Sequence, residues 1–223
     1  MEYCKINTLF MRDENNVIIP EEYTEDIFGA LENCLWECTE KIDGTNMRVE
    51  LVKEADGWKM AFGGRTDRAV IPPLLLARMH ELFDGVDWDE VFPAINTDVP
   101  VTIYGEGYGT KIQGCGSRYI PDGVDFILFD VKVGNLWLQR CACEDIAEEI
   151  HVSIVPFIDY MTIPDAIKFV RKGFTSTISA DKTLPAEGLV LKAPGGILDR
   201  RGRRIITKIK TKDFLDWERK SKS

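Results

Sequence analysis

The chain has 223 residues, 44% hydrophobic and 29% charged, a composition typical of a globular protein with its own apolar core. No stretch approaches the ~20 consecutive apolar residues that a membrane-spanning helix needs, and the N-terminus has no basic-then-apolar signal pattern, so we expect a soluble, cytoplasmic protein without a membrane partner. The six cysteines lack paired C-x-x-C spacing and there are only two histidines, which argues against a zinc site and favours reduced thiols.

Charge is distributed unevenly along the chain. The formal net charge is −9, but residues 200–223 contain ten Lys or Arg and three Asp or Glu, so +7 lies in the last 24 residues and −16 in the rest. Ile205, Ile206 and Ile209 interleave with these charges, which indicates an ordered strand rather than a solvated tail. The pattern predicts a basic edge on an acidic body.

The first half of the chain contains short predicted elements on either side of a lysine. Residues 4–10 are expected to be extended, and residues 21–31 to be helical because Pro20 precedes them. Residues 34–39 predict a strand before Lys41, and residues 47–52 its returning partner, since Asp43-Gly44 is typical of a tight turn in which glycine adopts a positive φ. Further predictions are a strand at 58–63 and helices at 74–83 and 88–92.

The second half is richer in strands. The patterns predict strands at 100–104, 125–133, 136–138, 185–192 and 205–210, and helices at 144–150 and 164–172. Strands outnumber helices and many are joined by hairpins, so the chain is expected to be α+β, with mainly antiparallel sheets flanked by helices. It has neither a G-x-G-x-x-G motif that opens a helix nor a G-x-x-x-x-G-K-[ST] motif, which argues against a dinucleotide-binding or P-loop fold.

Four motifs place a charged residue beside glycine or at the end of an apolar run. They are Lys41-Ile42-Asp43-Gly44, Tyr104-Gly105-Glu106, Glu187-Gly188-Leu189-Val190-Leu191-Lys192 and Lys208-Ile209-Lys210. Strand side chains alternate with period 2, so Lys208 and Lys210 are expected to point to one face, where two positive charges would bind phosphate. By itself K-x-D-G more often marks a solvent-facing lysine beside a turn; the prediction depends on the whole set.

With I-D-G-T-N, G-R-T, Y-G-E, F-D-V, E-G-L-V-L-K and K-I-K in this order, the chain resembles the covalent nucleotidyltransferases, most closely the ATP-dependent RNA ligases of the double-strand nick-sealing branch. The resemblance runs from about Lys5 to Lys212. It implies a nucleotidyltransferase (adenylation) domain of the ATP-grasp/DNA-ligase-like type. We expect one such domain over residues 1–223, a minimal form without an OB-fold or other C-terminal domain, and a separate protein domain that supplies RNA grip is compatible with this form.

The resemblance also implies a role for each motif residue. Lys41 would attack the α-phosphate of ATP to form lysyl-AMP, with Asp43 and Arg48 in support, and Glu187 would bind the water shell of Mg²⁺ or Mn²⁺. Lys208 and Lys210 would bind the α-phosphate. The other implied nucleotide contacts are Glu40 at the adenine edge, Asn46 at the α-phosphate or the incoming strand, Arg65 at ribose or phosphate, Glu106 at the ribose hydroxyls and Phe129 stacked on adenine.

The AMP would then pass to an RNA 5′-phosphate, and a 3′-hydroxyl would displace it and seal the strand. A lysine with its ordinary pKa of ~10.4 is protonated at neutral pH, so Lys41 would need burial or nearby cations to attack. Two alternatives are a nucleic-acid end-binding module without turnover and a GTP-using guanylyltransferase. Nicked duplexes, tRNA breaks and single-stranded ends are all compatible substrates.

Overall fold

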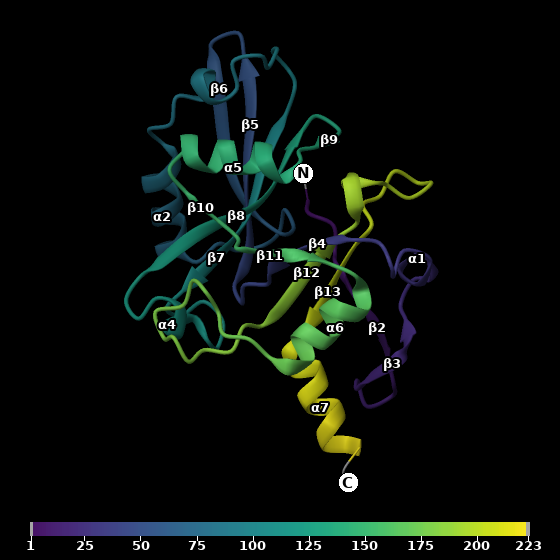
Figure 1. The fold of residues 1–223 in the computed structure, drawn as a ribbon. Helices are drawn as coiled ribbons and strands as arrows, with labels where there is room; N and C mark the ends of the chain where they lie inside the picture. The colour runs from purple at the N-terminus through teal and green to yellow at the C-terminus, as the bar shows by residue number, and fades with distance from the viewer. Residues whose placement is uncertain (1, 222–223) are drawn as a thin grey trace. The chain divides into compact units, whose positions relative to one another are not determined.

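The computed structural model describes residues 2–221, and the chain divides into two compact units. The central unit comprises Met1–Cys4 and Asp43–Val155, and the terminal unit comprises Lys5–Ile42 and Pro156–Ser223. The chain therefore leaves the terminal unit directly after Lys41-Ile42 and returns to it after Val155, a path that the colours of Figure 1 follow. None of the helices in the described part of the chain is long and apolar enough to cross a membrane.

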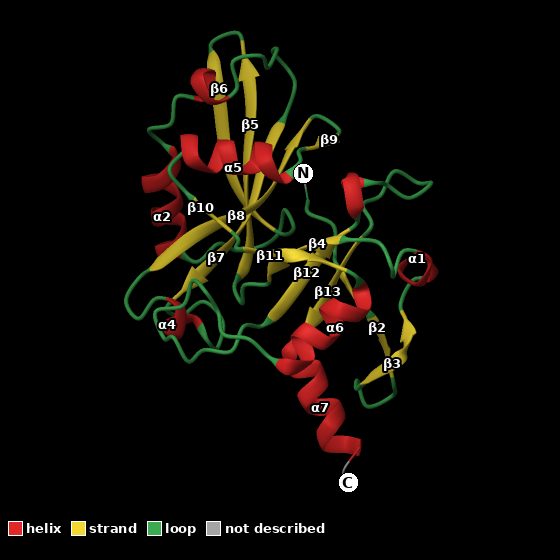
Figure 2. Cartoon of the chain, in the orientation of Figure 1, coloured by secondary structure: helices red, strands yellow, loops and turns green. Residues whose placement is uncertain are grey.

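The central unit is built on a six-stranded sheet with strand order β10-β8-β7-β5-β6, in which β9 also pairs with β8. All pairs are antiparallel except β10 with β8. The strands are β5 (Thr45–Glu54), β6 (Gly57–Gly64), β7 (Val101–Gly109), β8 (Val124–Val133), β9 (Leu136–Trp137) and β10 (Ser153–Ile154). The helices, red in Figure 2, are α2 (Pro73–Phe83), α3 (Trp88–Val91), α4 (Gly116–Tyr119) and α5 (Arg140–Glu149).

One face of this sheet carries the apolar core of the central unit. Alternate strand residues such as Val49 of β5 and Ile103 of β7 share a buried cluster with Met79 of α2 and Ile146 of α5. Because strand side chains alternate between faces, the residues between these core positions point away from the cluster. The opposite face therefore receives the even-numbered residues of β5 and β7.

The Tyr104-Gly105-Glu106 motif lies inside β7, which continues to Gly109 in register with β8. The prediction that this strand ends at residue 104 is wrong. Glycine weakens a strand in general, but it is required here because a Cβ on Gly105 would lie 2.2 Å from the ring of Phe126. The motif is therefore a strand segment with a packing glycine rather than a strand end.

The terminal unit contains a five-stranded sheet, order β1-β13-β12-β4-β11, and a separate β2-β3 pair. Only the β1–β13 pair is parallel in these two sheets. The strands are β1 (Asn7–Thr8), β2 (Phe10–Arg12), β3 (Ile18–Tyr23), β4 (Trp36–Glu40), β11 (Phe157–Met161), β12 (Gly188–Lys192) and β13 (Ile206–Lys210). The helices are α1 (Asp26–Ala30), α6 (Ile163–Lys172), α7 (Thr211–Ser221) and the 3-10 turn η1 (Pro194–Gly196).

A second apolar cluster lies inside the terminal unit. Trp36 of β4, Leu189 of β12 and Ile209 of β13 are buried together with Val170 of α6 and Phe214 of α7. In β12 and β13 the apolar residues of this cluster alternate with other residues, the lysines among them. Because the apolar side chains face this cluster, the lysines point to the opposite face of the sheet.

The expected hairpin around Asp43-Gly44 is wrong. β4 pairs with β11 and β12, whereas β5 pairs with β6 and β7 in the other unit. Gly44 is not among the glycines with positive φ in the described chain. Instead, a Cβ on Gly44 would lie 2.3 Å from the carbonyl oxygen of Gly107, so this glycine permits a close approach to β7.

The helix expected at residues 21–31 is also wrong over most of its length. Residues up to Tyr23 belong to β3, and only the short α1 follows. Pro20 lies within β3, whose one partner strand among residues 2–221 is β2, and proline is tolerated in such an edge strand. The other predicted strands and helices agree with the structure to within a few residues, and the α+β prediction with mainly antiparallel sheets is confirmed.

Candidate active site

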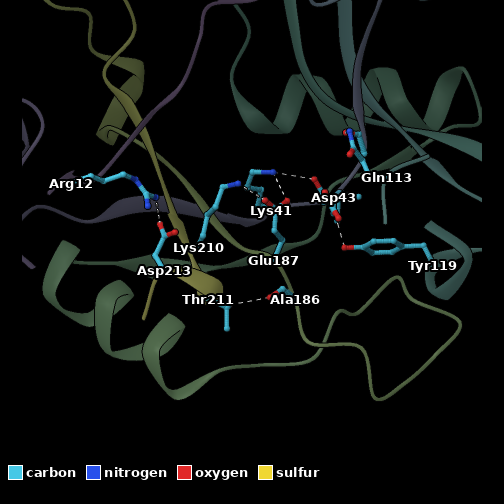
Figure 3. Close-up of polar contacts among 12 residues, drawn as sticks. Arg12, Lys41, Asp43, Gln113, Tyr119, Ala186, Glu187, Lys210, Thr211 and Asp213 are labelled. Carbon is cyan, nitrogen blue, oxygen red and sulfur yellow. Dashed lines mark hydrogen bonds and ion pairs between the residues drawn. The ribbon is translucent and has the colours of Figure 1, made fainter. Parts of the chain in front are cut away.

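Lys41 directly follows β4, and its side chain is only 19% exposed. Its backbone N–H donates to the carbonyl oxygen of Gly188 at 2.9 Å, which keeps the residue aligned with β12 beyond the end of its own strand. Nζ forms an ion pair with Glu187 and donates to the carbonyl oxygen of Ile42 at 3.3 Å. Figure 3 shows the Lys41 and Glu187 side chains pointing toward each other.

Glu187 binds two lysines at once. Oε2 contacts Nζ of Lys41, and Oε1 lies 2.9 Å from Nζ of Lys210. Figure 3 draws these three side chains together. The backbone around Glu187 is fastened to the start of α7, because Thr211 donates its N–H to the carbonyl of Glu187 at 2.9 Å and its hydroxyl to that of Ala186 at 3.0 Å. The carboxylate is thus held at the junction of β12, β13 and α7.

Gly188 is the residue that lets β12 and β13 close up beside Glu187. It has φ +148, and a Cβ at this position would lie 1.9 Å from the carbonyl oxygen of Ile209. Gly188 is paired with Lys210 in the sheet register. The glycine of the E-G-L-V-L-K motif therefore sets the approach of Lys210 to Glu187.

Lys208 and Lys210 alternate with the buried Ile209 on β13, as the period-2 pattern predicts. Burial lowers the pKa of Lys208, and the positive charges of Lys41 and Lys210 lower it further. Glu187 acts on this pKa in the opposite direction, as a smaller effect. The terminal unit therefore brings three lysines and one carboxylate into a single cluster, which we call the lysine–glutamate cluster.

Glu40 is the last residue of β4 and is only 1% exposed. Its Oε2 accepts from the backbone N–H of Thr177 at 3.1 Å and from the Thr177 hydroxyl at 2.8 Å. Its Oε1 is buried and has no hydrogen-bond partner within the described residues. An oxygen of this kind is an open acceptor, and an external donor that reached it would offset the cost of its burial.

In the central unit, Asn46 of β5 and Glu106 of β7 lie opposite each other in the register. Met47, the neighbour of Asn46, is part of the apolar core, so Asn46 and Glu106 lie on the opposite face of the sheet. The Asn46 Oδ1 atom is buried and makes no hydrogen bond within residues 2–221. The structure thus pairs two predicted site residues on the polar face of this unit.

Arg48 lies on the same face as Asn46 and is buried, with its guanidinium donating to the carbonyl of Gly64 and to Asp67. A Cβ on Gly63 would lie 2.7 Å from Arg48 Cζ, so this glycine makes room for the guanidinium. Arg65 follows β6 and is exposed. Arg48 therefore braces the end of the strand that presents Arg65.

Phe129 occupies a β-bulge of β8. The register with β7 passes from Leu128 to Asp130 and leaves Phe129 as the extra residue. Its half-buried ring packs edge-on against Tyr3, with ring centroids 5.1 Å apart. A bulge re-aims a side chain locally, but stacking of Phe129 on adenine stays a prediction.

No three His, Cys, Asp or Glu side chains are grouped as a metal site in the part of the chain that the structure describes. The lysine–glutamate cluster offers one carboxylate, that of Glu187. Mg²⁺ keeps several water ligands and is often held by only one or two carboxylates together with substrate phosphates. The donor set therefore fits a water-rich metal bound with a nucleotide and does not fit an all-protein cage.

The predicted residues thus fall into two groups. The terminal unit holds Lys41, Glu40, Glu187, Lys208 and Lys210, and the central unit holds Asp43, Asn46, Arg65, Glu106 and Phe129. Two supporting residues, Thr177 and Thr211, were not predicted. Thr211 directly follows the K-I-K motif and opens a helix, which is a usable signal, whereas Thr177 lies in a loop 137 residues from its partner Glu40.

Comparison with known proteins places the chain in a family and shows its fold. A family model described as RNA ligase matches residues 35–210, and no curated protein matches. Among solved structures, the chain is similar to Naegleria gruberi RNA ligase with PPi, with a TM-score of 0.61 and 19% identity over 99% of this chain and 58% of that one. A mutant of that ligase with ATP and Mn gives 0.62 and 16%, over 98% and 63%. The chain thus spans about three-fifths of these relatives, and the likeness shows a shared fold.

Proposed function

We propose that this chain, which belongs to the RNA ligase family, is an ATP-dependent RNA ligase that works through a covalent lysyl-AMP. The observation that carries the proposal is the lysine–glutamate cluster, in which Glu187 binds both Lys41 and Lys210 and Lys208 lies beside them. A module that only binds nucleic-acid ends has no use for a lysine nucleophile. The cluster therefore supports an enzyme over a binding module.

The proposed reaction has three displacements at phosphorus. First, Nζ of Lys41 bonds to the α-phosphorus of ATP while the bond to the pyrophosphate oxygen breaks. Next, an oxygen of an RNA 5′-phosphate bonds to the same phosphorus, and the lysine leaves with a proton. Finally, an RNA 3′-hydroxyl attacks the 5′-phosphorus, loses its proton, and AMP leaves. The proposed partner is thus RNA with 5′-phosphate and 3′-hydroxyl ends.

The other members of the cluster support the first displacement electrostatically. An attacking amine must give up a proton, and the Glu187 carboxylate is in direct contact with Nζ of Lys41. Lys208 and Lys210 project from one strand face, where their charges would stabilise the α-phosphate as pyrophosphate leaves. Because β13 already fixes the positions of Lys208 and Lys210, these side chains need little reorganisation when negative charge develops on the phosphate.

Mg²⁺ or Mn²⁺ is the proposed metal, and Glu187 is the residue proposed to hold it, mostly through water. When bound, the ion would supply positive charge at the phosphates. Both carboxylate oxygens of Glu187 are engaged by lysines, so we expect metal and lysines to share this carboxylate in the loaded protein.

Further contacts with the nucleotide are proposed for each unit by itself. The open Oε1 of Glu40 can accept from the exocyclic amino group of adenine, whereas guanine presents an oxygen at the corresponding position. Asn46 at the α-phosphate and Glu106 at the ribose hydroxyls are the proposed contacts on the central unit, supported by their shared polar face. Arg65 at ribose or phosphate is proposed from its position at the end of β6.

The test is incubation with ATP labelled at the α-phosphate and Mg²⁺. We expect acid-labile, alkali-stable label on the protein, lost in Lys41→Ala and retained in Lys192→Ala, a β12 lysine that pairs with Glu37. Label from ATP but not from GTP separates the ligase from a guanylyltransferase. Absence of label from either nucleotide contradicts the proposal and favours the binding module.

A further inference from the structure

We propose that residues 197–204, the basic loop that joins β12 to β13, bind the phosphate backbone of RNA about 20 Å from the lysine–glutamate cluster. The loop contains Arg200, Arg201, Arg203 and Arg204 and one acidic residue, Asp199. In Figure 1 it is the yellow-green segment that extends beyond the ends of β12 and β13. The inference rests on the proposed ligase function and adds to it a surface that holds RNA away from the reacting ends.

The loop is a folded hairpin tip. Asp199 Oδ1 accepts the backbone N–H groups of Arg201 and Arg203, each at 2.8 Å, and Oδ2 binds the Arg203 guanidinium at 2.8 Å. Gly202, with φ +73, supplies the left-handed residue that the turn requires. An antiparallel β-bridge between Leu198 and Arg204 joins the two sides of the hairpin. Since its backbone is already ordered, the loop would lose little conformational entropy on binding.

Two of the arginines are available to a ligand. Arg200 and Arg201 are exposed, and the described chain holds no ion pair of either side chain. Many other surface cations are neutralised, as in the pairs of Lys59 with Asp56 and Lys168 with Asp165. The protein as a whole is acidic, so two guanidinium groups without ion pairs in the described chain form a local basic patch on this ordered loop. Arginine pairs well with phosphate, and such a patch is typical of a surface that binds a nucleic-acid backbone.

The distance to the lysine–glutamate cluster follows from the sheet. Lys210 pairs with Gly188 near Glu187, and Ile206 pairs with Lys192 at the far end of the same two strands. From Lys210 to Arg204 is six residues, or about 20 Å at ~3.4 Å per strand residue. An RNA backbone that reaches both the lysine–glutamate cluster and the loop would therefore have to span about 20 Å.

The experiment compares Arg200→Ala/Arg201→Ala with the charge-matched control Lys59→Ala/Lys168→Ala, whose lysines are already paired. Binding to a nicked RNA duplex with a 5′-phosphate is measured by fluorescence anisotropy over a range of salt. We expect the arginine variant to bind at least about fivefold more weakly, and the slope of log K against log salt to fall by about 1.4–1.8, at ~0.7–0.9 per lost phosphate contact. The control should bind like the unmodified chain.

Length dependence locates the contact. Shortening the RNA on the side that reaches the loop until it can no longer span about 20 Å should abolish the difference between the variant and the unmodified chain. The inference is overturned if the arginine variant keeps its affinity and salt slope, or if the control loses as much. Self-labelling with ATP is measured in parallel: its absence in every protein contradicts the ligase, whereas normal labelling with unchanged RNA binding contradicts only the loop.

Discussion

Thr177 donates both its backbone N–H and its hydroxyl to one oxygen of Glu40, at 3.1 and 2.8 Å, and the other oxygen of this buried carboxylate is left open. Two donors on one oxygen fix the rotation of the carboxylate. The open Oε1 is then held in one direction, which is the arrangement expected of a residue that recognises a donor on a ligand.

Thr177→Val should therefore weaken the use of ATP. The substitution removes the hydroxyl and keeps the shape, and a hydrogen bond to a charged group contributes about 1.5–3 kcal/mol. We expect the ATP concentration for half-maximal self-labelling to rise about tenfold and preference over GTP to fall. Thr183→Val is the matched control, since the Thr183 hydroxyl binds Asp181 in the same way on an exposed site. Equal effects in both variants would contradict the role of Thr177.

Asn46→Ala should separate function from stability. The Asn46 amide oxygen is buried without a hydrogen-bond partner in the described chain, so its removal should change the free energy of unfolding by less than about 1 kcal/mol. If Asn46 contacts the α-phosphate region, self-labelling should fall by at least about tenfold, which corresponds to a loss of ~1.4 kcal/mol of interaction free energy. Thermal melting and labelling are measured together, with the exposed Asn96→Ala as control. A large loss of stability with normal labelling would show a structural role instead.

Lys208→Met should raise the melting temperature at pH 7 while it reduces labelling. Burial and the charges of Lys41 and Lys210 lower the pKa of Lys208 from 10.5, so the charged form destabilises the folded state below the folded-state pKa. As the pH rises through that pKa the residue loses its proton and the cost disappears, because the unfolded chain then binds more protons. The stability gain of the variant should therefore shrink between pH 7 and pH ~10.5.

The control for Lys208→Met is Lys192→Met, which removes a lysine that is paired with Glu37 on the neighbouring strand. We expect no such gain at pH 7 in this control. A fall in the melting temperature of Lys208→Met at pH 7, or a gain that does not change with pH, would contradict the claim that the charge of Lys208 destabilises the folded state.

Gly188→Ala should destabilise the protein and disable it. The added Cβ would meet the Ile209 carbonyl oxygen at 1.9 Å in a residue with φ +148, so β12 and β13 would have to separate. Overpacking and backbone strain each cost about 1–3 kcal/mol, which gives an expected loss of about 2–6 kcal/mol in the free energy of unfolding, measured by chemical denaturation. Gly85→Ala, which has nothing within 4 Å of its Cβ position, should be close to neutral.

Much of this site could be predicted from local patterns. The spacing of Lys208 and Lys210 follows from the alternation of a strand, and the glycines beside Glu106 and Glu187 mark positions where a Cβ cannot fit. Such features depend on neighbours in the chain, so strand and turn patterns were enough to predict the α+β fold and motif order was enough to predict the ligase family, both of which hold.

Local patterns could not predict which distant segments of the chain pair with each other. Asp43-Gly44 has the composition of a tight turn, yet β4 and β5 join different sheets. The backbone groups of β4 are satisfied by β12, far along the chain, whereas those of β5 are satisfied by β6 and β7. Thr177 likewise meets Glu40 only through folding. Local residue types limit which conformations a segment can adopt, but the choice among them rests on long-range hydrogen bonds and burial, and these exist only once the chain has packed.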